Sequence, residues 1–351
     1  MRFVWMLILL IAALLGAGVP VSAHASWPTY TVHAMIDAPI GLDESRRALA
    51  VNASGVQLIF VDTPGPGMGY GLCQAGNCIS GNPPGGDNNW VVSGLSDSGA
   101  LAGAIFEGFD VAFAGNDVFG YDRIGCPGCA FIDNLNSQAK GVNTAGMATG
   151  WAQFAGGGPA RAFRYTVSGG MLDLGTLGGS TSEGLAINAA GDVAGNAQLT
   201  GNTVTRAFRF AGGQMIHLGT LGGAASSSYA YDLNDAGKVV GCAYNSAAVP
   251  VLQAFRHNGN GMVALPPLAN GKPSCALAIN NADVAVGRAH NASGAQRAVI
   301  FKGQQVKNLN QLLAPGSTGW TLLEAVGIND SGVIVGNGLY NGVMQAFVLQ
   351  P

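Results

Sequence analysis

The hydrophobic pattern of the chain is dominated by one short frame that returns along its length. An apolar residue is followed by Asn, two variable residues and Gly, and then by an alternation of apolar and small residues that ends in a second Gly. The clearest copies are residues 187–195, 233–241 and 328–336, and 142–150 is a fourth. The segments beside the turn are short and often β-branched, which is typical of strands. A fixed repeat period identifies the architecture of a protein, so this frame says more about the fold than any single residue does.

The step from Asn to Gly in each frame predicts a tight β-hairpin turn. An Asn side chain at the start of a turn can hydrogen-bond the backbone two residues on, and Gly supplies a positive φ without a Cβ clash. We therefore predict a type I turn closed by a bulge. In one copy Asp283 replaces this Gly, and Asp tolerates the left-handed conformation. The turn residues at the Asn position are Asn52, Ser96, Asn143, Asn188, Asn234, Asn280 and Asn329.

Two further repeated motifs follow each turn. The first is Arg-Ala-Phe-Arg at 161–164 and 206–209, and it becomes Gln-Ala-Phe at 253–255 and 345–347. A Gly-rich turn then leads to a fourth segment, seen most clearly at 171–179. Each unit thus predicts four short strands. A sheet this small cannot bury both of its faces alone, so the units must stack on one another.

The spacing of the turns predicts that the stacked sheets close into a ring. The turn residues recur about every 46 residues, within the roughly 40–50 residues of known propeller blades. Residues 30–36 occupy the place of a fourth strand, and the last unit ends at 346–351 without one of its own. We therefore predict an all-β, seven-bladed β-propeller of four-stranded blades, with the N-terminal strand completing the last blade. Six or eight blades are the alternatives. Ring closure removes exposed sheet edges.

The first 25 residues predict a secretory signal peptide. Arg2 provides a positive start, and 6–15 is an apolar segment too short to span a membrane. Small residues predict cleavage after Ala23 or Ala25, and an uncleaved anchor is the alternative. Residues 26–351 would then form a single β-propeller domain of about seven repeats. We expect this domain to be secreted or periplasmic, monomeric and without a membrane span.

The composition excludes one class of partner and argues against disorder. Only 10% of the residues are charged, the formal net charge is −3, and no basic stripe occurs, so nucleic acid is a poor partner. The low charge does not indicate disorder, because 48% of the residues are hydrophobic and they are patterned. The 55 Gly residues fit an all-β fold with many tight turns.

Six cysteines in an exported chain suggest structural disulfides. The candidates are Cys73, Cys78, Cys126, Cys129, Cys242 and Cys275. The first four form two close pairs within 62–89 and 115–136, which are predicted to be long loops and a specialised surface. The last two come from neighbouring units and form the third possible bridge, one arrangement among fifteen. The C-x-x-C spacing of the second pair also permits a redox or metal role, but the context for either is missing.

The repeat motifs together resemble a known family. Arg-Ala-Phe-Arg, Met-x-x-Leu-Gly-Thr-Leu-Gly-Gly and Ala-Ile-Asn-x-x-Gly-x-Val-x-Gly are similar to the bacterial extracellular repeats called HAF repeats. The tripeptide that gives the family its name, His-Ala-Phe, appears here as Arg-Ala-Phe or Gln-Ala-Phe, so the first residue of the tripeptide differs from the family pattern. The resemblance covers about 140–351 well and 30–140 weakly. It implies an exported bacterial β-propeller-like protein, and it implies no activity and no catalytic residues.

No catalytic, cofactor-binding or metal-binding residue can be assigned from the sequence. The turn Asn and Asp residues invite a calcium interpretation, but acids at alternate positions are missing. The His residues lack a metal-ligand spacing, and no G-x-S-x-G motif occurs. The acids are scattered, so no glycosidase pair can be chosen. Arg164, Arg209 and Arg256 recur at one phase and could form an anion-binding ring, although a strand-pairing role is the simpler interpretation.

For function, we expect a non-enzymatic binding or surface-interaction module that holds a glycan or a protein through one face of the ring. This expectation rests on architecture alone. An extracellular hydrolase or lyase with its site over the channel, and a structural envelope component, are the alternatives. Acids or His converging with perturbed pKa values at one mouth of the channel would favour an enzyme. A flat apolar or aromatic rim from Trp90, Trp151 and Trp320 would favour binding.

Overall fold

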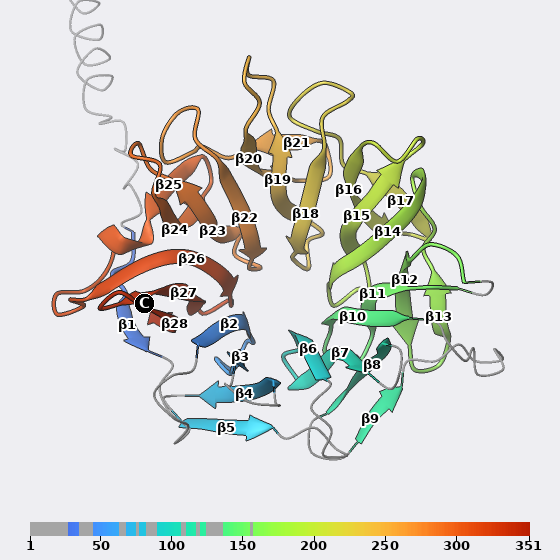
Figure 1. Ribbon diagram of the computed structural model, residues 1–351, viewed down its shortest axis with the longest axis horizontal. Helices are drawn as coiled ribbons and strands as arrows, with labels where there is room; N and C mark the ends of the chain where they lie inside the picture. Colours follow the sequence, from blue (N-terminus) through green and yellow to red (C-terminus); the bar gives the residue numbers. More distant parts are fainter. Residues whose placement is uncertain are drawn as a thin grey trace, which may run out of the picture.

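A computed structural model describes residues 27–34, 45–62, 68–74, 77–81, 90–106, 110–116, 120–123, 136–154 and 157–351. The predicted signal peptide, together with Cys126 and Cys129, lies outside these residues. The described strands form seven four-stranded antiparallel sheets, arranged around a central axis (Figure 1). This is an all-β propeller. We number its sheets as blades 1 to 7 in chain order.

In blades 1 to 6 the four strands follow one another along the chain, from the innermost strand outward, and in blade 7 the first three do. Blades 1 to 3 contain β2 (Ser45–Val51), β3 (Gln57–Asp62), β4 (Met68–Gln74) and β5 (Asn77–Gly81); β6 (Trp90–Leu95), β7 (Ala100–Phe106), β8 (Asp110–Asn116) and β9 (Gly120–Arg123); and β10 (Ser137–Val142), β11 (Ala148–Ala152), β12 (Arg161–Thr166) and β13 (Gly170–Asp173). Blades 4 and 5 contain β14 (Gly178–Ile187), β15 (Val193–Leu199), β16 (Thr205–Ala211) and β17 (Gln214–His217); and β18 (Ser228–Leu233), β19 (Val239–Tyr244), β20 (Leu252–His257) and β21 (Met262–Ala264). Blades 6 and 7 contain β22 (Ser274–Ile279), β23 (Val284–His290), β24 (Gln296–Lys302) and β25 (Gln305–Asn308); and β26 (Trp320–Ile328), β27 (Ile334–Tyr340), β28 (Val343–Gln350) and β1 (Thr31–Ala34). A short 3-10 turn, η1 (Leu309–Gln311), leads from blade 6 to blade 7.

The two ends of the chain share blade 7. The N-terminal strand β1 pairs with the last strand β28, so that Ala34 lies opposite Phe347 and Thr31 lies opposite Gln350. Tyr30, just before β1, is buried and bonds across to Leu312 through its backbone N–H at 2.7 Å. The N-terminal strand therefore takes the outermost place in the last blade, as the missing fourth strand of the last repeat predicted.

The recurrent Asn-x-x-Gly frame forms the hairpin between the two innermost strands of each blade. In blade 4 the Asn188 N–H donates to the Asp192 carbonyl at 3.1 Å, and the Gly191 N–H donates to the Asn188 carbonyl at 3.0 Å. Gly191 has a φ of 80°. Asp283, which replaces the Gly in blade 6, has a φ of 63°, so it adopts the left-handed conformation expected of it.

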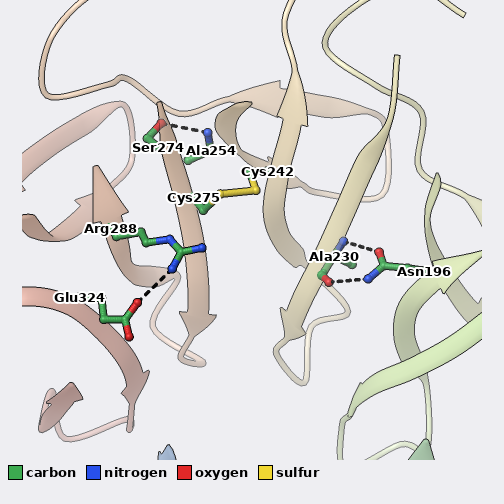
Figure 2. The surroundings of a disulfide bond; sticks show 8 residues. All are labelled: Asn196, Ala230, Cys242, Ala254, Ser274, Cys275, Arg288 and Glu324. Atoms are coloured by element: carbon green, nitrogen blue, oxygen red, sulfur yellow. Dashed lines mark hydrogen bonds and ion pairs between the residues drawn. A yellow bond between two sulfur atoms is a disulfide. The ribbon is translucent and has the colours of Figure 1, made fainter. Parts of the chain in front are cut away.

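The second Gly of the frame lets a blade's second strand pass close to its first. In blade 5 a Cβ on Gly241 would collide with the Tyr229 carbonyl oxygen and would lie 2.9 Å from the Phe255 ring. Phe255 is the Phe of the Gln-Ala-Phe motif and is fully buried. The preceding Ala254 donates its N–H to the Ser274 Oγ of blade 6 at 3.0 Å (Figure 2). The repeated residues thus answer packing demands within and between blades.

The interpretation of residues 62–89 and 115–136 as long loops was wrong in part. The first range contains β4 and β5, which complete blade 1, and the second contains β9, which completes blade 2. Pro-Gly clusters surround β4 and β5, and Gly lies within them, so local propensity disguised these strands. Pairing with the neighbouring strand decides their conformation instead.

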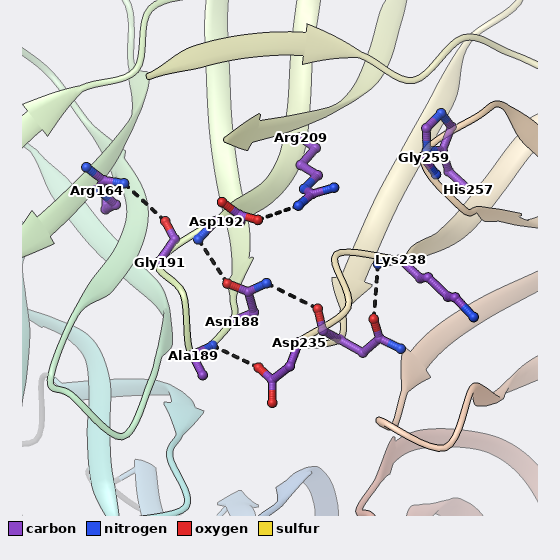
Figure 3. Close-up of polar contacts among 11 residues, drawn as sticks. Arg164, Asn188, Ala189, Gly191, Asp192, Arg209, Asp235, Lys238, His257 and Gly259 are labelled. Atoms are coloured by element: carbon purple, nitrogen blue, oxygen red, sulfur yellow. Dashed lines mark hydrogen bonds and ion pairs between the residues drawn. The ribbon is translucent and has the colours of Figure 1, made fainter. Parts of the chain in front are cut away.

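The turn Asn side chains link neighbouring blades into a ring around the axis. Asn188 Nδ2 donates to the Asn234 carbonyl of the next blade at 3.2 Å, while its Oδ1 accepts the Asp192 N–H at 2.9 Å (Figure 3). Asn329 closes the ring by donating to the Asn52 carbonyl at 3.0 Å. Equivalent bonds leave Asn52, Asn143, Asn234 and Asn280.

Blade 2 interrupts this ring, because its turn residue is Ser96. The Ser96 Oγ accepts the Ala100 N–H at 2.9 Å, which preserves the bond within the turn. Its other hydrogen bond is with Ser98, so Ser96 does not bond the carbonyl of Asn143 in blade 3 as the Asn side chains of the other blades bond their neighbours. A hydroxyl is too short to replace both ends of a carboxamide.

The ring predicts opposite effects for two reciprocal substitutions. Asn234→Ser should lower the free energy of unfolding by about 1–2 kcal/mol, since the Asn280 carbonyl loses its side-chain donor and keeps only the Asp283 N–H. Ser96→Asn should raise the free energy of unfolding by about 1 kcal/mol by adding a side-chain donor to the Asn143 carbonyl. Urea unfolding followed by intrinsic fluorescence measures both changes. Equal stability of Asn234→Ser and the wild-type protein would show that the ring contributes nothing.

Candidate functional site: the central channel

The innermost strands of the seven blades surround a channel with two cavities. The outer cavity, about 220 Å³, is lined by the turn residues of blades 2 to 7 and, in every blade, by the residue that follows the turn residue. The inner cavity, about 250 Å³, is lined by residues earlier in the same strands. Between them lies an apolar girdle, whose members line one or both cavities: Val51, Leu95, Val142, Ile187, Leu233, Ile279 and Ile328.

The mouth of the outer cavity carries three exposed carboxylates. Asp97, Asp235 and Asp330 each follow a turn residue of the ring. Each accepts a backbone N–H from the equivalent position of the preceding blade, as Asp235 Oδ1 does from Ala189 at 2.9 Å (Figure 3). Asn281, at the same position in blade 6, donates to Oδ2 of Asp235 at 2.9 Å and of Asp330 at 3.0 Å. Among the described residues that line this cavity, none is Lys or Arg.

A β-bulge in each innermost strand supplies the side chains of the inner cavity. The register of β18, for example, shifts between Ala230 and Asp232, and the extra residue is Tyr231. Bulges re-aim side chains, which explains why the extra residue of every blade lines this cavity. The extra residues are Leu49, Ser93, Lys140, Leu185, Tyr231, Leu277 and Val326.

Asp232 breaks the repeat at the position after the bulge. The equivalent residues of the other six blades are all Ala or Gly. Asp232 lines both cavities, and its two carboxylate oxygens accept the N–H groups of Leu233 and Ile279, each at 2.8 Å. Burial raises the pKa of Asp232 to about 7, against the opposing effect of these two hydrogen bonds. Sequence analysis missed this residue, although comparing the repeats position by position would have singled it out.

Three of the scattered acids lie in ion pairs, and a fourth, Glu107, lies outside the described residues. Asp173 is 2.8 Å from Arg161, and Glu324 is 3.1 Å from Arg288. Glu183 is 3.8 Å from Lys140, and burial raises its pKa against the effect of that Lys. None of the three lines the outer cavity. The perturbed acid of the channel is therefore Asp232, not a pair drawn from these residues.

The recurrent Arg residues tie strands to turns. Arg209 lies 2.5 Å from Asp192 of the same blade, and Arg164 donates to the Gly191 carbonyl of the next blade at 3.2 Å (Figure 3). Arg256 lies 3.0 Å from Asp283 of the next blade. These contacts agree with the simpler interpretation of the Arg residues as structural, and they engage the groups that an anion-binding ring would need.

The described cysteines lie in strands rather than loops. A disulfide joins Cys242 in β19 to Cys275 in β22, with a Cα–Cα distance of 4.8 Å, and so links blades 5 and 6 (Figure 2). Cys73 is buried and disulfide-bonded, and the strand register places it opposite Cys78. Within the part of the chain that the structure describes, no three His, Cys, Asp or Glu side chains gather as a metal site would require.

The Trp residues do not share one rim. Trp320 is half-buried in blade 7, with its ring 5.2 Å from that of Tyr340 and 6.2 Å from that of Phe347. Trp151 lines a separate pocket between blades 3 and 4. The side chain of Trp90 lies outside the description. Trp151 and Trp320 therefore do not provide the aromatic mouth that sequence analysis considered.

Comparison with known proteins finds structures of similar fold and a match of part of the chain to a family model, and neither assigns a function. A family model described as "Protein of unknown function (DUF3466)" matches residues 176–347. No comparison names HAF repeats, so that resemblance stays a prediction. No curated protein matches the sequence. Among the described residues, no helix has the length and apolar character needed to cross a membrane.

Several solved structures are similar in fold. A puromycin-hydrolyzing peptidase from Mycobacterium tuberculosis is 10% identical, with a TM-score of 0.57, and the match covers 90% of this chain and 52% of that chain. A puromycin hydrolase is 14% identical, with a TM-score of 0.56 and coverage of 89% and 53%. YCF48 bound to D1 peptide is 9% identical, with a TM-score of 0.51 and coverage of 93% and 98%. The chain thus spans about half the length of the two hydrolases, and at these identities the likeness concerns the fold alone.

The buried carboxyl group predicts a defined pH dependence of stability. Folded Asp232 keeps its proton up to about pH 7, whereas the unfolded chain loses it near the ordinary Asp pKa of 3.8. The contribution of this group to the free energy of unfolding is therefore fully present below about pH 4 and is lost as the pH rises to about 7. Asp232→Asn should gain stability relative to the wild-type protein across this window. Urea unfolding at several pH values tests this, and parallel pH profiles for the two proteins would contradict it.

Proposed function

We propose that the protein is an extracytoplasmic, non-enzymatic binding module whose ligand places a positively charged group in the mouth of the central channel. The observation that carries this proposal is the convergence of Asp97, Asp235 and Asp330 on a cavity of about 220 Å³. A lysine or arginine side chain of a partner protein has the charge and the shape for this cavity. Concave sites lined by charge of one sign concentrate ligands of the opposite sign.

The hydrogen bonds at the mouth leave the carboxylate charges uncompensated. Each Asp uses one oxygen for a backbone N–H of the neighbouring turn, and this bond holds the carboxylate in place without neutralising it. Two of the recurrent Arg residues do not line this cavity and are paired elsewhere, Arg209 with Asp192 and Arg256 with Asp283. A cationic group entering the mouth would relieve repulsion among three fixed negative charges.

The same contacts favour binding over catalysis. The ring carboxamides and the mouth carboxylates are occupied by hydrogen bonds that hold the blades together, and six of the seven turns repeat the same residue. Asp232 is a single, partly buried acid held by two backbone N–H groups, whereas glycoside hydrolysis uses two carboxylates across a substrate. The likeness to peptidases concerns the fold alone and does not support a hydrolase.

In this proposal the seven sheets act as the blades of one closed ring, and residues 1–25 direct its export. The disulfide between Cys242 and Cys275 supports an oxidising compartment, because disulfides persist there. Expressed in a bacterium, the full chain should fractionate with the periplasm or the medium, and thiol labelling of the denatured protein should leave these cysteines unmodified until a reductant is added. A cytoplasmic, fully reduced product would contradict export.

The mouth predicts charge-dependent binding of peptides. The triple variant Asp97→Asn, Asp235→Asn and Asp330→Asn removes the charge but keeps an acceptor for each backbone N–H. The wild-type protein should bind a short fluorescent peptide containing lysine more tightly than its glutamine counterpart, and raised salt should weaken binding. The triple variant should lose at least about tenfold in affinity for the lysine peptide, measured by fluorescence anisotropy.

Asn281 justifies these substitutions, because it is an Asn at the same position that accepts the Asp235 backbone N–H at 2.9 Å. Thermal unfolding of the triple variant supplies the control for folding. Equal binding of the lysine and glutamine peptides by the wild-type protein would overturn the proposal.

A further inference from the structure

Neighbouring blades meet at a recurrent seam, formed by the residue after the second Gly of one blade and the innermost strand of the next. At the seam of blades 5 and 6, Cys242 and Cys275 form the disulfide. At the seam of blades 6 and 7, Arg288 lies 3.1 Å from Glu324 (Figure 2). Each pair closes its seam with a direct side-chain bond.

Amide side chains close two other seams. Asn196, at the seam of blades 4 and 5, accepts the Ala230 N–H at 2.8 Å and donates to the Ala230 carbonyl at 3.3 Å (Figure 2). Asn337, at the seam of blades 7 and 1, accepts the Ala48 N–H at 2.9 Å. Four seams thus use three kinds of contact, a disulfide, an ion pair and Asn hydrogen bonds, to bind one blade to the next.

The seam of blades 3 and 4 is open by comparison. Its equivalent residues are Trp151 and Glu183, and they line a pocket of about 350 Å³ instead of bonding to each other. The other lining residues are Ala160, Thr181, Ser182, Asn196, Ala197, Gln198 and Thr205. A volume of this size lies within the range of small-ligand sites.

The walls of the pocket are held by bonds that do not need a ligand. Ser182 accepts the Ala162 N–H at 2.8 Å and donates to the Gly175 carbonyl at 2.5 Å. Gln198 accepts a hydrogen bond from Ser180 at 3.2 Å through Oε1, which leaves its NH₂ group for another partner. A rigid wall reduces the ordering cost of binding a ligand.

We propose that the pocket between Trp151 and Glu183 is a binding site for one neutral sugar unit of a glycan. The indole supplies a large apolar surface with a single donor, suited to the C–H face of a sugar ring. The Glu183 carboxylate accepts hydrogen bonds and the Gln198 carboxamide donates them, so together they match neighbouring hydroxyl groups. Lys140 lies 3.8 Å from Glu183 and offsets its charge, so the site selects a neutral ligand over a charged one.

This site lies between two blades and is independent of the channel mouth, because none of its lining residues lines the outer cavity. A substitution at this site would also differ in its effect from a substitution at one of the four closed seams. Replacing either Glu would break an ion pair, with Lys140 for Glu183 and with Arg288 for Glu324, but only Glu183 lines the pocket. Glu324→Gln is therefore a matched control for Glu183→Gln, at the same position of a different seam.

The experiment is a glycan array probed with the mature wild-type protein, followed by calorimetric titration with the soluble form of the best neutral glycan. Trp151→Ala should abolish binding, Trp151→Phe should restore part of it, and Glu183→Gln should weaken it at least tenfold. Glu324→Gln should bind like the wild-type protein. A bound glycan should also shift the intrinsic fluorescence of the wild-type protein but not of Trp151→Phe.

Two outcomes would overturn the site. One is that no neutral glycan binds the wild-type protein, and the other is that binding survives Trp151→Ala unchanged. Binding of the lysine peptide at the channel mouth serves as the folding control for every variant. A variant that still binds the peptide but no longer binds the glycan has lost only the seam pocket. A variant that loses peptide binding alone bears on the channel proposal and not on this one.

Discussion

Face-to-face packing of small sheets is the interaction on which the rest of the structure depends. A four-stranded sheet of this size has two faces to bury and can cover them only with its neighbours. Phe255, at the core of blade 5, fits because Gly241 brings the strands of that blade close together. The Gly and Phe positions therefore recur in the sequence for a packing reason, and the ring is the arrangement that leaves no blade with a bare face.

Bringing the blades to one axis creates a second demand, which concerns polar backbone groups at the centre. The turn carbonyls of neighbouring blades converge there, and the carboxamides of residues such as Asn188 and Asn329 satisfy them. The channel is thus lined by polar groups that are largely committed to the fold. Function is better sought in residues that depart from the repeat, because a residue present in every copy answers a structural need.

Two such departures have different consequences. Asp232 places one carboxyl group in an apolar girdle, where burial raises its pKa and couples the stability of the ring to pH. Trp151 and Glu183 leave one seam open, while four other seams carry a disulfide, an ion pair or Asn hydrogen bonds. A repeat protein can change such positions singly, because the remaining blades keep the ring closed.

The sequence by itself determined the repeat unit, the turns and the role of the N-terminal strand, because these depend on local conformation and on spacing along the chain. Asn52 and its counterparts marked the hairpins correctly, and the positive φ of Asp283 followed from its place in the frame. Sequence analysis missed strands β4, β5 and β9, because Gly and Pro residues in and around them lower the local strand propensity. Pairing with the neighbouring strand of the blade makes them strands nonetheless. The Asn ring and the open seam were decided by the tertiary structure alone, since both join residues of different repeats that only closure of the ring brings together.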